Sequence, residues 1–208
     1  MTEKVYKSKI EPFAKWHKGR NCYAVWMYRF EDLRLKQLMV KLQKELSQLI
    51  AFHPFTKPHL TVATAGFPSK VQKRHDDISY KDIIDCAANL QEQSFEQPVI
   101  RLKKLATFPH CAYIECVDLT PSSINLNKNL NKQKAKFAPH ISLGVYLEDK
   151  HQHELESFFS QEIAQIDLTV RSLECVSFSS KALGNIPICP EDYQTIASVN
   201  FKTADLSK

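Results

Sequence analysis

Two short segments of the sequence share a pattern of residues that could do chemistry. The first reads Pro58-His59-Leu60-Thr61-Val62 and the second reads Pro139-His140-Ile141-Ser142-Leu143. Given the histidine, serine and threonine content, about one His-x-Ser/Thr is expected by chance, but the shared proline and apolar positions make a matched pair far rarer. The two segments therefore supply the first candidates for a functional site.

Strand geometry would place the polar residues of each segment together. Side chains alternate between the two faces of a strand, so His59 and Thr61 would point one way while Leu60 and Val62 point into the layer behind. His140 and Ser142 would be arranged in the same way in the second segment. Each proline suits the first residue of a strand, because that position can do without a backbone N–H.

Two histidines and two hydroxyl groups suit the cleavage of a phosphodiester. The reaction needs a base to activate the attacking oxygen and an acid to protonate the leaving one, and histidine can do either near neutral pH. The hydroxyls of Thr61 and Ser142 could donate hydrogen bonds to the nonbridging phosphoryl oxygens. This scheme needs no metal. The alternative interpretation is that all four are ordinary polar residues at strand starts, hydrogen-bonded to nearby backbone groups.

The elements that would position these segments form a partial repeat. Before the first segment we expect a strand over 23–28 and an amphipathic helix within 31–50 that buries Leu35, Leu38, Leu42, Leu46 and Leu49. Before the second we expect strands over 100–108 and 111–117, then a weak helix within 119–136. A further helix is expected over 150–163. It would point His151 and His153 in different directions, which argues against a metal pair.

With these motifs and this partial repeat, the chain resembles the 2H phosphoesterase superfamily, and within it the 2′-5′ RNA ligase-like or cyclic phosphodiesterase branch. The resemblance implies an α+β fold of two pseudo-symmetric lobes, each a small, mainly antiparallel sheet backed by helices, with both motifs in a central groove. It implies one domain over 1–208, His59 and His140 as catalytic residues, and Thr61 and Ser142 as phosphate-binding residues. Val145 stands where several ligase-related members carry an arginine, which weakens the ligase interpretation.

The resemblance most readily suggests a metal-independent hydrolase of nucleoside or RNA-terminal 2′,3′-cyclic phosphates or 2′-5′ linkages, without a cofactor. One alternative is a hydrolase of cyclic or 2′-5′-linked signalling oligonucleotides. Another is a non-catalytic RNA- or nucleotide-binding module, and a protein-interaction domain would leave both motifs unexplained. We expect an RNA end or a nucleotide as the partner, a monomer, and no obligate protein partner.

Charge and composition agree with an anionic substrate and a reducing compartment. The formal net charge is +5 and the pI is about 8.8, which favours anions. Two basic segments could steer phosphates if they border the groove; they contain Arg101 and Lys103 in the first, and Lys128, Lys132, Lys134 and Lys136 in the second. Six cysteines without a Cys-x-x-Cys pair, no signal peptide and no membrane-length apolar run indicate the cytoplasm.

Aromatic residues near the motifs could stack on a base. The candidates are Phe55, Phe67, Phe137 and Tyr146, although each could equally belong to the core. Composition also predicts weak order over 121–136, 179–192 and 203–208.

Overall fold

The computed structural model describes residues 4–9, 11–52, 58–131, 137–180 and 193–202. The helices within these ranges are α1 (Glu11–His17), α2 (Leu33–Leu46), α3 (Tyr80–Glu92), α4 (Ser122–Leu130) and α5 (Glu156–Phe159), with a 3-10 helix η1 (Gln152–Leu155). The strands are β1 (Lys4–Val5), β2 (Cys22–Arg29), β3 (Ile50–Phe52), β4 (His59–Pro68), β5 (Asp77–Ile78), β6 (Val99–Thr107), β7 (Cys111–Asp118), β8 (His140–Tyr146), β9 (Lys150–His151), β10 (Asp167–Thr169), β11 (Ser172–Ser179) and β12 (Tyr193–Asn200).

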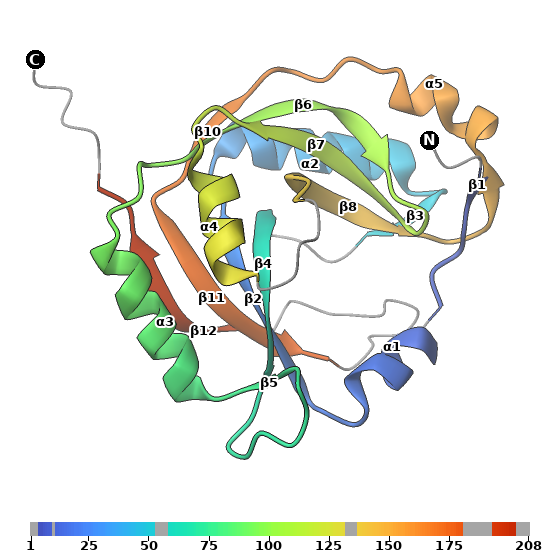
Figure 1. Ribbon diagram of the computed structural model, residues 1–208. Coiled ribbons are helices and arrows are strands. Elements are labelled where there is room, and N and C mark those ends of the chain that lie inside the picture. The colour runs from blue at the N-terminus through green and yellow to red at the C-terminus, as the bar shows by residue number, and fades with distance from the viewer. Residues whose placement is uncertain (1–3, 10, 53–57, 132–136, 181–192, 203–208) are drawn as a thin grey trace, which may run out of the picture.

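Ten of the twelve strands described build two five-stranded sheets that lie side by side (Figure 1), and β1 and β9 pair as a separate two-stranded sheet. Sheet 1 has the order β12-β11-β2-β4-β5, and sheet 2 has the order β10-β6-β7-β8-β3. The strand that begins with a motif histidine is the fourth in both orders, and it pairs antiparallel with the strand before it, β4 with β2 and β8 with β7. The two motif strands also contact each other at the centre of the molecule. The α+β architecture of two related lobes is thus confirmed.

The start of each motif strand is fixed in the same way. Pro58 accepts a hydrogen bond on its carbonyl from the backbone N–H of Phe30 at 2.9 Å, and Pro139 accepts one from Cys116 at 3.0 Å. Proline lacks an N–H, so it can open a strand through its carbonyl alone.

Helix α2 links the first half of the chain to sheet 2. Asp32 caps it by accepting hydrogen bonds from the backbone N–H groups of Arg34 and Leu35, and its buried face consists of Leu35, Met39, Leu42 and Leu46. At its start, Arg34 donates to the carbonyl of Asp167 in β10 at 3.3 Å. After α2, β3 pairs with β8. The α2-β3 unit therefore completes the lobe formed by the second half.

Helix α4 makes the reciprocal connection, because it follows β7 of sheet 2 and packs on β4 of sheet 1 (Figure 1). The buried Asn127 side chain donates to the carbonyl of Val62, inside the first motif, at 2.6 Å. Ser123 donates to the hydroxyl of Tyr28 in β2 at 3.1 Å. Each lobe is thus closed by a helix from the other half of the chain.

Several expected elements occur where the sequence places them. The predicted strands over 23–28, 100–108 and 111–117 correspond to β2, β6 and β7, and the first predicted helix is α2. Leu35, Leu42 and Leu46 are buried as expected, while Leu38 and Leu49 are only partly buried. The weak helix expected within 119–136 corresponds to α4, which buries Ser122, Ser123, Leu126 and Asn127.

The expected helix over 150–163 is wrong. This segment forms β9, η1 and the short α5 instead, because Lys150 and His151 pair with Val5 and Lys4 of β1. The other segments expected to be weakly ordered fall largely outside the described residues, at 132–136, 181–192 and 203–208. Among the described residues, no helix is long and apolar enough to cross a membrane.

Candidate active site

The first motif presents its two polar residues on one face of β4. His59 and Thr61 are half-buried, whereas Leu60 and Val62 are buried in the core behind. His59 lies opposite Arg29 of β2, and Thr61 lies opposite Met27. The alternation expected for the first motif is therefore present, with His59 and Thr61 on the side away from the core.

The second motif repeats this arrangement on β8. His140 and Ser142 are half-buried, and Ile141 and Leu143 are in the core. His140 lies opposite Glu115 of β7, and Ser142 lies opposite Tyr113. Since β4 and β8 contact each other, the fold brings together the two strands that carry the motifs, whose histidines are 81 residues apart in sequence (140 − 59).

The ring of His140 is held in a defined orientation. Its Nδ1 lies 2.7 Å from the carbonyl oxygen of Ala138. A carbonyl can only accept, so Nδ1 carries the proton and the neutral ring has its lone pair on Nε2. Burial lowers the pKa of His140, and the hydrogen bond to Ala138 opposes this only in part. The neutral ring, which can act as a base, is thus favoured at neutral pH.

Two aromatic rings lie against His140. Phe108 and Tyr113 stack with their centroids 4.1 Å apart, and both meet the imidazole edge-on at 5.0 and 5.3 Å. These rings supply the burial that lowers the histidine pKa. Sequence analysis missed them, although Tyr113 lies in a predicted strand whose alternate residues are apolar.

The hydroxyl of Ser142 has a neighbour that the sequence did not indicate. The Cys111 thiol donates to the carbonyl of Ala112 at 3.3 Å and also interacts with Ser142, and burial raises the pKa of this thiol. The thiol therefore stays protonated at neutral pH, so it places no negative charge beside the Ser142 hydroxyl.

An ion pair lies beside His59 on sheet 1. Arg29 contacts the carboxylate of Glu174 in β11 at 2.6 Å, and Thr195 donates to the same carboxylate at 3.0 Å. Glu174 is buried, so it needs these partners. Both residues were missed by sequence analysis, although a single charge within an apolar strand is a recognisable signal of a buried pair.

The basic residues expected near the motifs divide into two groups. Arg101 and Lys103 lie on β6, where Leu102 between them is buried. They pair with Asp167 and Glu115, and Glu115 is the residue opposite His140. Lys128 is exposed on α4, and Lys132, Lys134 and Lys136 lie outside the described residues.

The aromatic candidates need correction. Phe67 is only 1% exposed and Tyr146 only 2%, so neither can offer a ring face to a base. Phe67 packs among Trp16 and Tyr23 at the far end of β4, and Tyr146 hydrogen-bonds to Thr107 at 2.6 Å. Phe137 is partly buried against the core, and Phe55 lies outside the described residues.

His151 and His153 do not lie on one helix as expected, because His151 belongs to β9 and His153 to η1. Their rings stack with centroids 5.6 Å apart. Within the described part of the chain, no group of three or more His, Cys, Asp or Glu side chains could hold a metal ion.

Comparison with known proteins agrees with this arrangement. A family model described as the 2′-5′ RNA ligase superfamily matches residues 23–182, which include both motifs. No curated protein is significantly similar to the chain in sequence.

Solved structures of two proteins share the fold. E. coli LigT in the apo form is 11% identical with a TM-score of 0.54, covering 89% of this chain and 100% of LigT. LigT complexed with 3′-AMP is 13% identical with a TM-score of 0.55, covering 86% and 99%. TT0787 of Thermus thermophilus is 11% identical with a TM-score of 0.54, covering 86% and 97%. At these identities the likeness shows the fold alone.

Proposed function

Because the chain belongs to the 2′-5′ RNA ligase superfamily of 2H phosphoesterases, we propose that it is a metal-independent phosphodiesterase acting on RNA-type phosphodiesters. The substrate is a nucleoside or RNA-terminal 2′,3′-cyclic phosphate or a 2′-5′ linkage. The observation that carries the proposal is the matched pair of motifs on two contacting strands, each with its histidine and hydroxyl on the face away from the core.

His140 is the general base in this mechanism. Its Nδ1 proton is held by Ala138, its Nε2 carries the lone pair, and burial favours the neutral ring. Nε2 takes a proton from the attacking water as the new P–O bond forms.

His59 is the general acid and protonates the oxygen that leaves as the old P–O bond breaks. One imidazole gains a proton while the other loses one, so a proton returns to His59 before the next turnover. Thr61 and Ser142 donate hydrogen bonds to the nonbridging oxygens, where charge develops in the transition state.

The net positive charge and one relative support a nucleotide substrate. The chain carries a formal charge of +5, which favours association with polyanions. LigT, which shares the fold, has been crystallised with 3′-AMP. 3′-AMP is an isomer of the 2′-phosphate expected when a 2′,3′-cyclic phosphate is opened.

The experiment is hydrolysis, in chelator, of a substrate panel by three proteins. The panel contains nucleoside 2′,3′-cyclic phosphates, 2′-5′ and 3′-5′ dinucleotides, and cyclic dinucleotides. The proteins are the wild type, the His59→Ala/His140→Ala double variant, and a His151→Ala/His153→Ala double variant that removes two exposed histidines elsewhere.

We expect the wild type and the control variant to cleave a cyclic phosphate or a 2′-5′ linkage, and the motif variant to be inactive. Activity in the motif variant would refute the two-histidine mechanism. Salt-sensitive binding without turnover by the wild type would instead indicate a nucleotide-binding module. Preference for cyclic dinucleotides would indicate a signalling-nucleotide hydrolase.

A further inference from the structure

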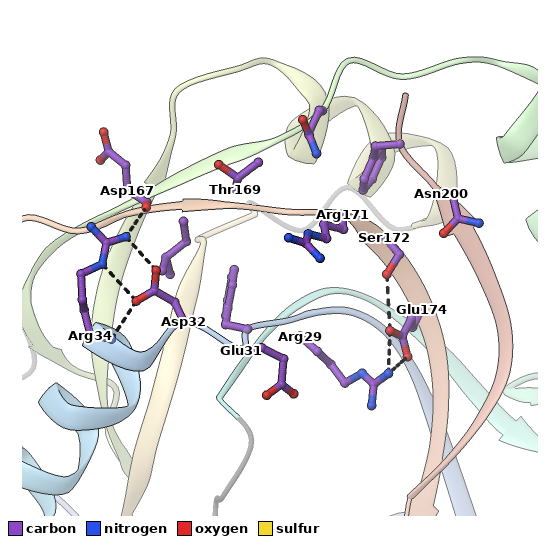
Figure 2. Close-up of a pocket in the computed structure, with 14 residues that line it drawn as sticks. Arg29, Glu31, Asp32, Arg34, Asp167, Thr169, Arg171, Ser172, Glu174 and Asn200 are labelled. Atoms are coloured by element: carbon purple, nitrogen blue, oxygen red, sulfur yellow. Dashed lines mark hydrogen bonds and ion pairs between the residues drawn. The ribbon is translucent and has the colours of Figure 1, made fainter. Parts of the chain in front are cut away.

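A pocket of about 920 Å³ opens beside the first motif, between the two sheets. Its walls come from the end of β2, the start of α2, the β10-β11 segment and the end of β12 (Figure 2). Arg29 belongs to the wall and lies opposite His59 in the β2-β4 pair. Cβ atoms of residues opposite each other are about 5 Å apart, so the pocket adjoins the candidate active site.

The pocket lining holds four carboxylates and three arginines, and two further cations outside the lining, Arg101 and Lys36, pair with carboxylates of it. Four carboxylates line it, and each has a cationic partner: Glu174 with Arg29, Asp32 with Arg34, Asp167 with Arg101, and Glu31 with Lys36. Arg171 is the remaining charged residue of the lining, and its side chain has no ion pair or hydrogen bond within the described residues. Figure 2 shows its side chain reaching into the pocket with no dashed line to it. The described part of the pocket thus has one uncompensated guanidinium.

The backbone holds Arg171 in place while its side chain remains available. Arg171 lies in the two-residue crossing from β10 of sheet 2 to β11 of sheet 1. Its carbonyl accepts a hydrogen bond from Phe201 at 3.0 Å, and the preceding Val170 donates to Pro98 at 3.0 Å. Gln97 donates to the Val170 carbonyl at 3.1 Å. A guanidinium on a fixed backbone can bind an anion without first ordering a loop.

We propose that this pocket binds a second phosphate of the substrate, next to the phosphodiester cleaved between the histidines, and that Arg171 is the residue that holds it. A guanidinium matches phosphate because it can donate two parallel hydrogen bonds. The second phosphate is either the internucleotide phosphate of an oligonucleotide or the 5′-phosphate of a mononucleotide. This inference rests on the proposed function and specifies its substrate as one with two phosphates.

The test compares three substrates that share the same reacting group. They are adenosine 2′,3′-cyclic phosphate, its 5′-phosphorylated form, and the dinucleotide ApA ending in a 2′,3′-cyclic phosphate. kcat/KM is measured for the wild type, Arg171→Gln and the control Arg74→Gln. Arg74 is an exposed arginine near Asp77, which pairs with the end of β4 distant from His59.

The wild type should favour one or both two-phosphate substrates. In Arg171→Gln the ratio of kcat/KM between two-phosphate and one-phosphate substrates should fall about ten-fold, the effect of losing a hydrogen bond to a charged group. Arg74→Gln should leave this ratio unchanged. If only the dinucleotide has a higher kcat/KM than the one-phosphate substrate, the pocket binds an internucleotide phosphate. If only the 5′-phosphorylated compound does, the pocket binds the 5′-phosphate of a mononucleotide.

Equal kcat/KM for all three substrates, or an equal loss for all three in Arg171→Gln, would overturn the inference while leaving the proposed function intact. If the wild type cleaves none of them and also fails on a 2′-5′ dinucleotide, the proposed function fails, and calorimetric measurement of binding then tests the pocket. Tighter binding of the 3′-phosphate of ApA than of 3′-AMP, lost in Arg171→Gln, would support the pocket. Equal binding of the two would refute it.

Discussion

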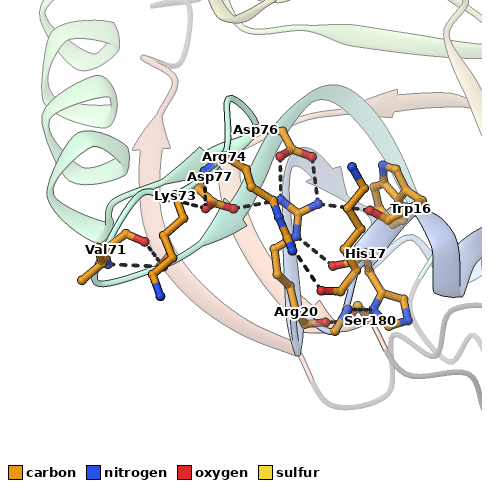
Figure 3. Close-up of polar contacts among 12 residues, drawn as sticks. Trp16, His17, Arg20, Val71, Lys73, Arg74, Asp76, Asp77 and Ser180 are labelled. Carbon is orange, nitrogen blue, oxygen red and sulfur yellow. Dashed lines mark hydrogen bonds and ion pairs between the residues drawn. The ribbon is translucent and has the colours of Figure 1, made fainter.

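Replacing Arg20 should show how much a largely buried arginine contributes to the free energy of unfolding of this protein. Its guanidinium contacts Asp76 through two hydrogen bonds of 2.6 and 2.9 Å and Asp77 through one of 2.8 Å (Figure 3). It also donates to the carbonyls of His17 and Trp16. The side chain is 14% exposed, so water replaces these contacts poorly.

The expected loss in Arg20→Ala follows from these contacts. A hydrogen bond to a charged group contributes about 1.5 to 3 kcal/mol to the free energy of unfolding. The two bonds from one guanidinium to one carboxylate are not additive. The guanidinium also lies over the ring of Phe67 at 3.3 Å. Allowing for the solvent that reaches Asp76, which is 30% exposed, we expect unfolding free energy to fall by about 2 to 3 kcal/mol.

Arg34→Ala is the matched control. Arg34 also forms two hydrogen bonds to one aspartate, Asp32, at 3.1 and 2.7 Å, but its side chain is 63% exposed. Exposed pairs contribute little, so the loss should be much smaller. Arg20→Lys keeps the positive charge but not the planar guanidinium. Its unfolding free energy should therefore lie between those of the wild type and Arg20→Ala.

The assay is urea unfolding followed by circular dichroism, from pH 7 down to pH 3. The hydrogen bond from Arg20 lowers the pKa of Asp76 and of Asp77. Their contribution is therefore complete above the ordinary aspartate pKa of about 3.9 and is lost as the pH falls through the lowered values. The difference in unfolding free energy between the wild type and Arg20→Ala should therefore become smaller at acid pH. A loss no larger than that of Arg34→Ala, or one independent of pH, would refute the reasoning.

Four further results are expected. The acid limb of kcat/KM should lie below the ordinary histidine pKa of about 6.5, because burial lowers the pKa of His140 and the base must be neutral; a pH-rate profile with the limb above that value would contradict the assignment. Thr61→Ala and Ser142→Ala should each lower transition-state stabilisation by about 2 to 4 kcal/mol in steady-state kinetics, with unchanged unfolding midpoints. Asn127→Ala should reduce unfolding free energy by about 1 to 3 kcal/mol in urea, because the hydrogen bond to Val62 is buried. Turnover should persist undiminished in EDTA, since both proton transfers use histidines, and an absolute need for added divalent metal would count against the mechanism.

The local part of the structure could be predicted from the sequence. The alternation in both motifs, the apolar spacing of α2 and the strands β6 and β7 depend on neighbouring residues, and the structure agrees with them. The helix over 150–163 failed because a long-range contact, the pairing of β9 with β1, overrides local preference. That the two motif strands contact each other was expected from the family resemblance and not from residue spacing.

The missed site residues depend on contacts between distant parts of the chain. Arg29 and Glu174 are 145 residues apart (174 − 29), and only the β2-β11 pairing makes them neighbours. Burial of Phe67 likewise depends on Trp16 and Arg20, which come from the segment around α1. Arg171 resembles any surface arginine until the crossing between the sheets places it in the pocket.

The order of strands in sheet 1 has a consequence for synthesis on the ribosome. In this sheet β2 lies between β4 and β11. β4 comes soon after β2 in the sequence, whereas β11 spans residues 172–179, near the end of the chain. The first motif histidine is therefore made long before the sheet that supports it can close, and α4, which supports the same strand, is also made later. A nascent chain that ends before β11 leaves one edge of β2 without its strand partner. The face of the first lobe that carries His59 and Thr61 is then completed only after nearly all of the chain has emerged, and the apolar strand β2 lacks its final neighbour until that moment.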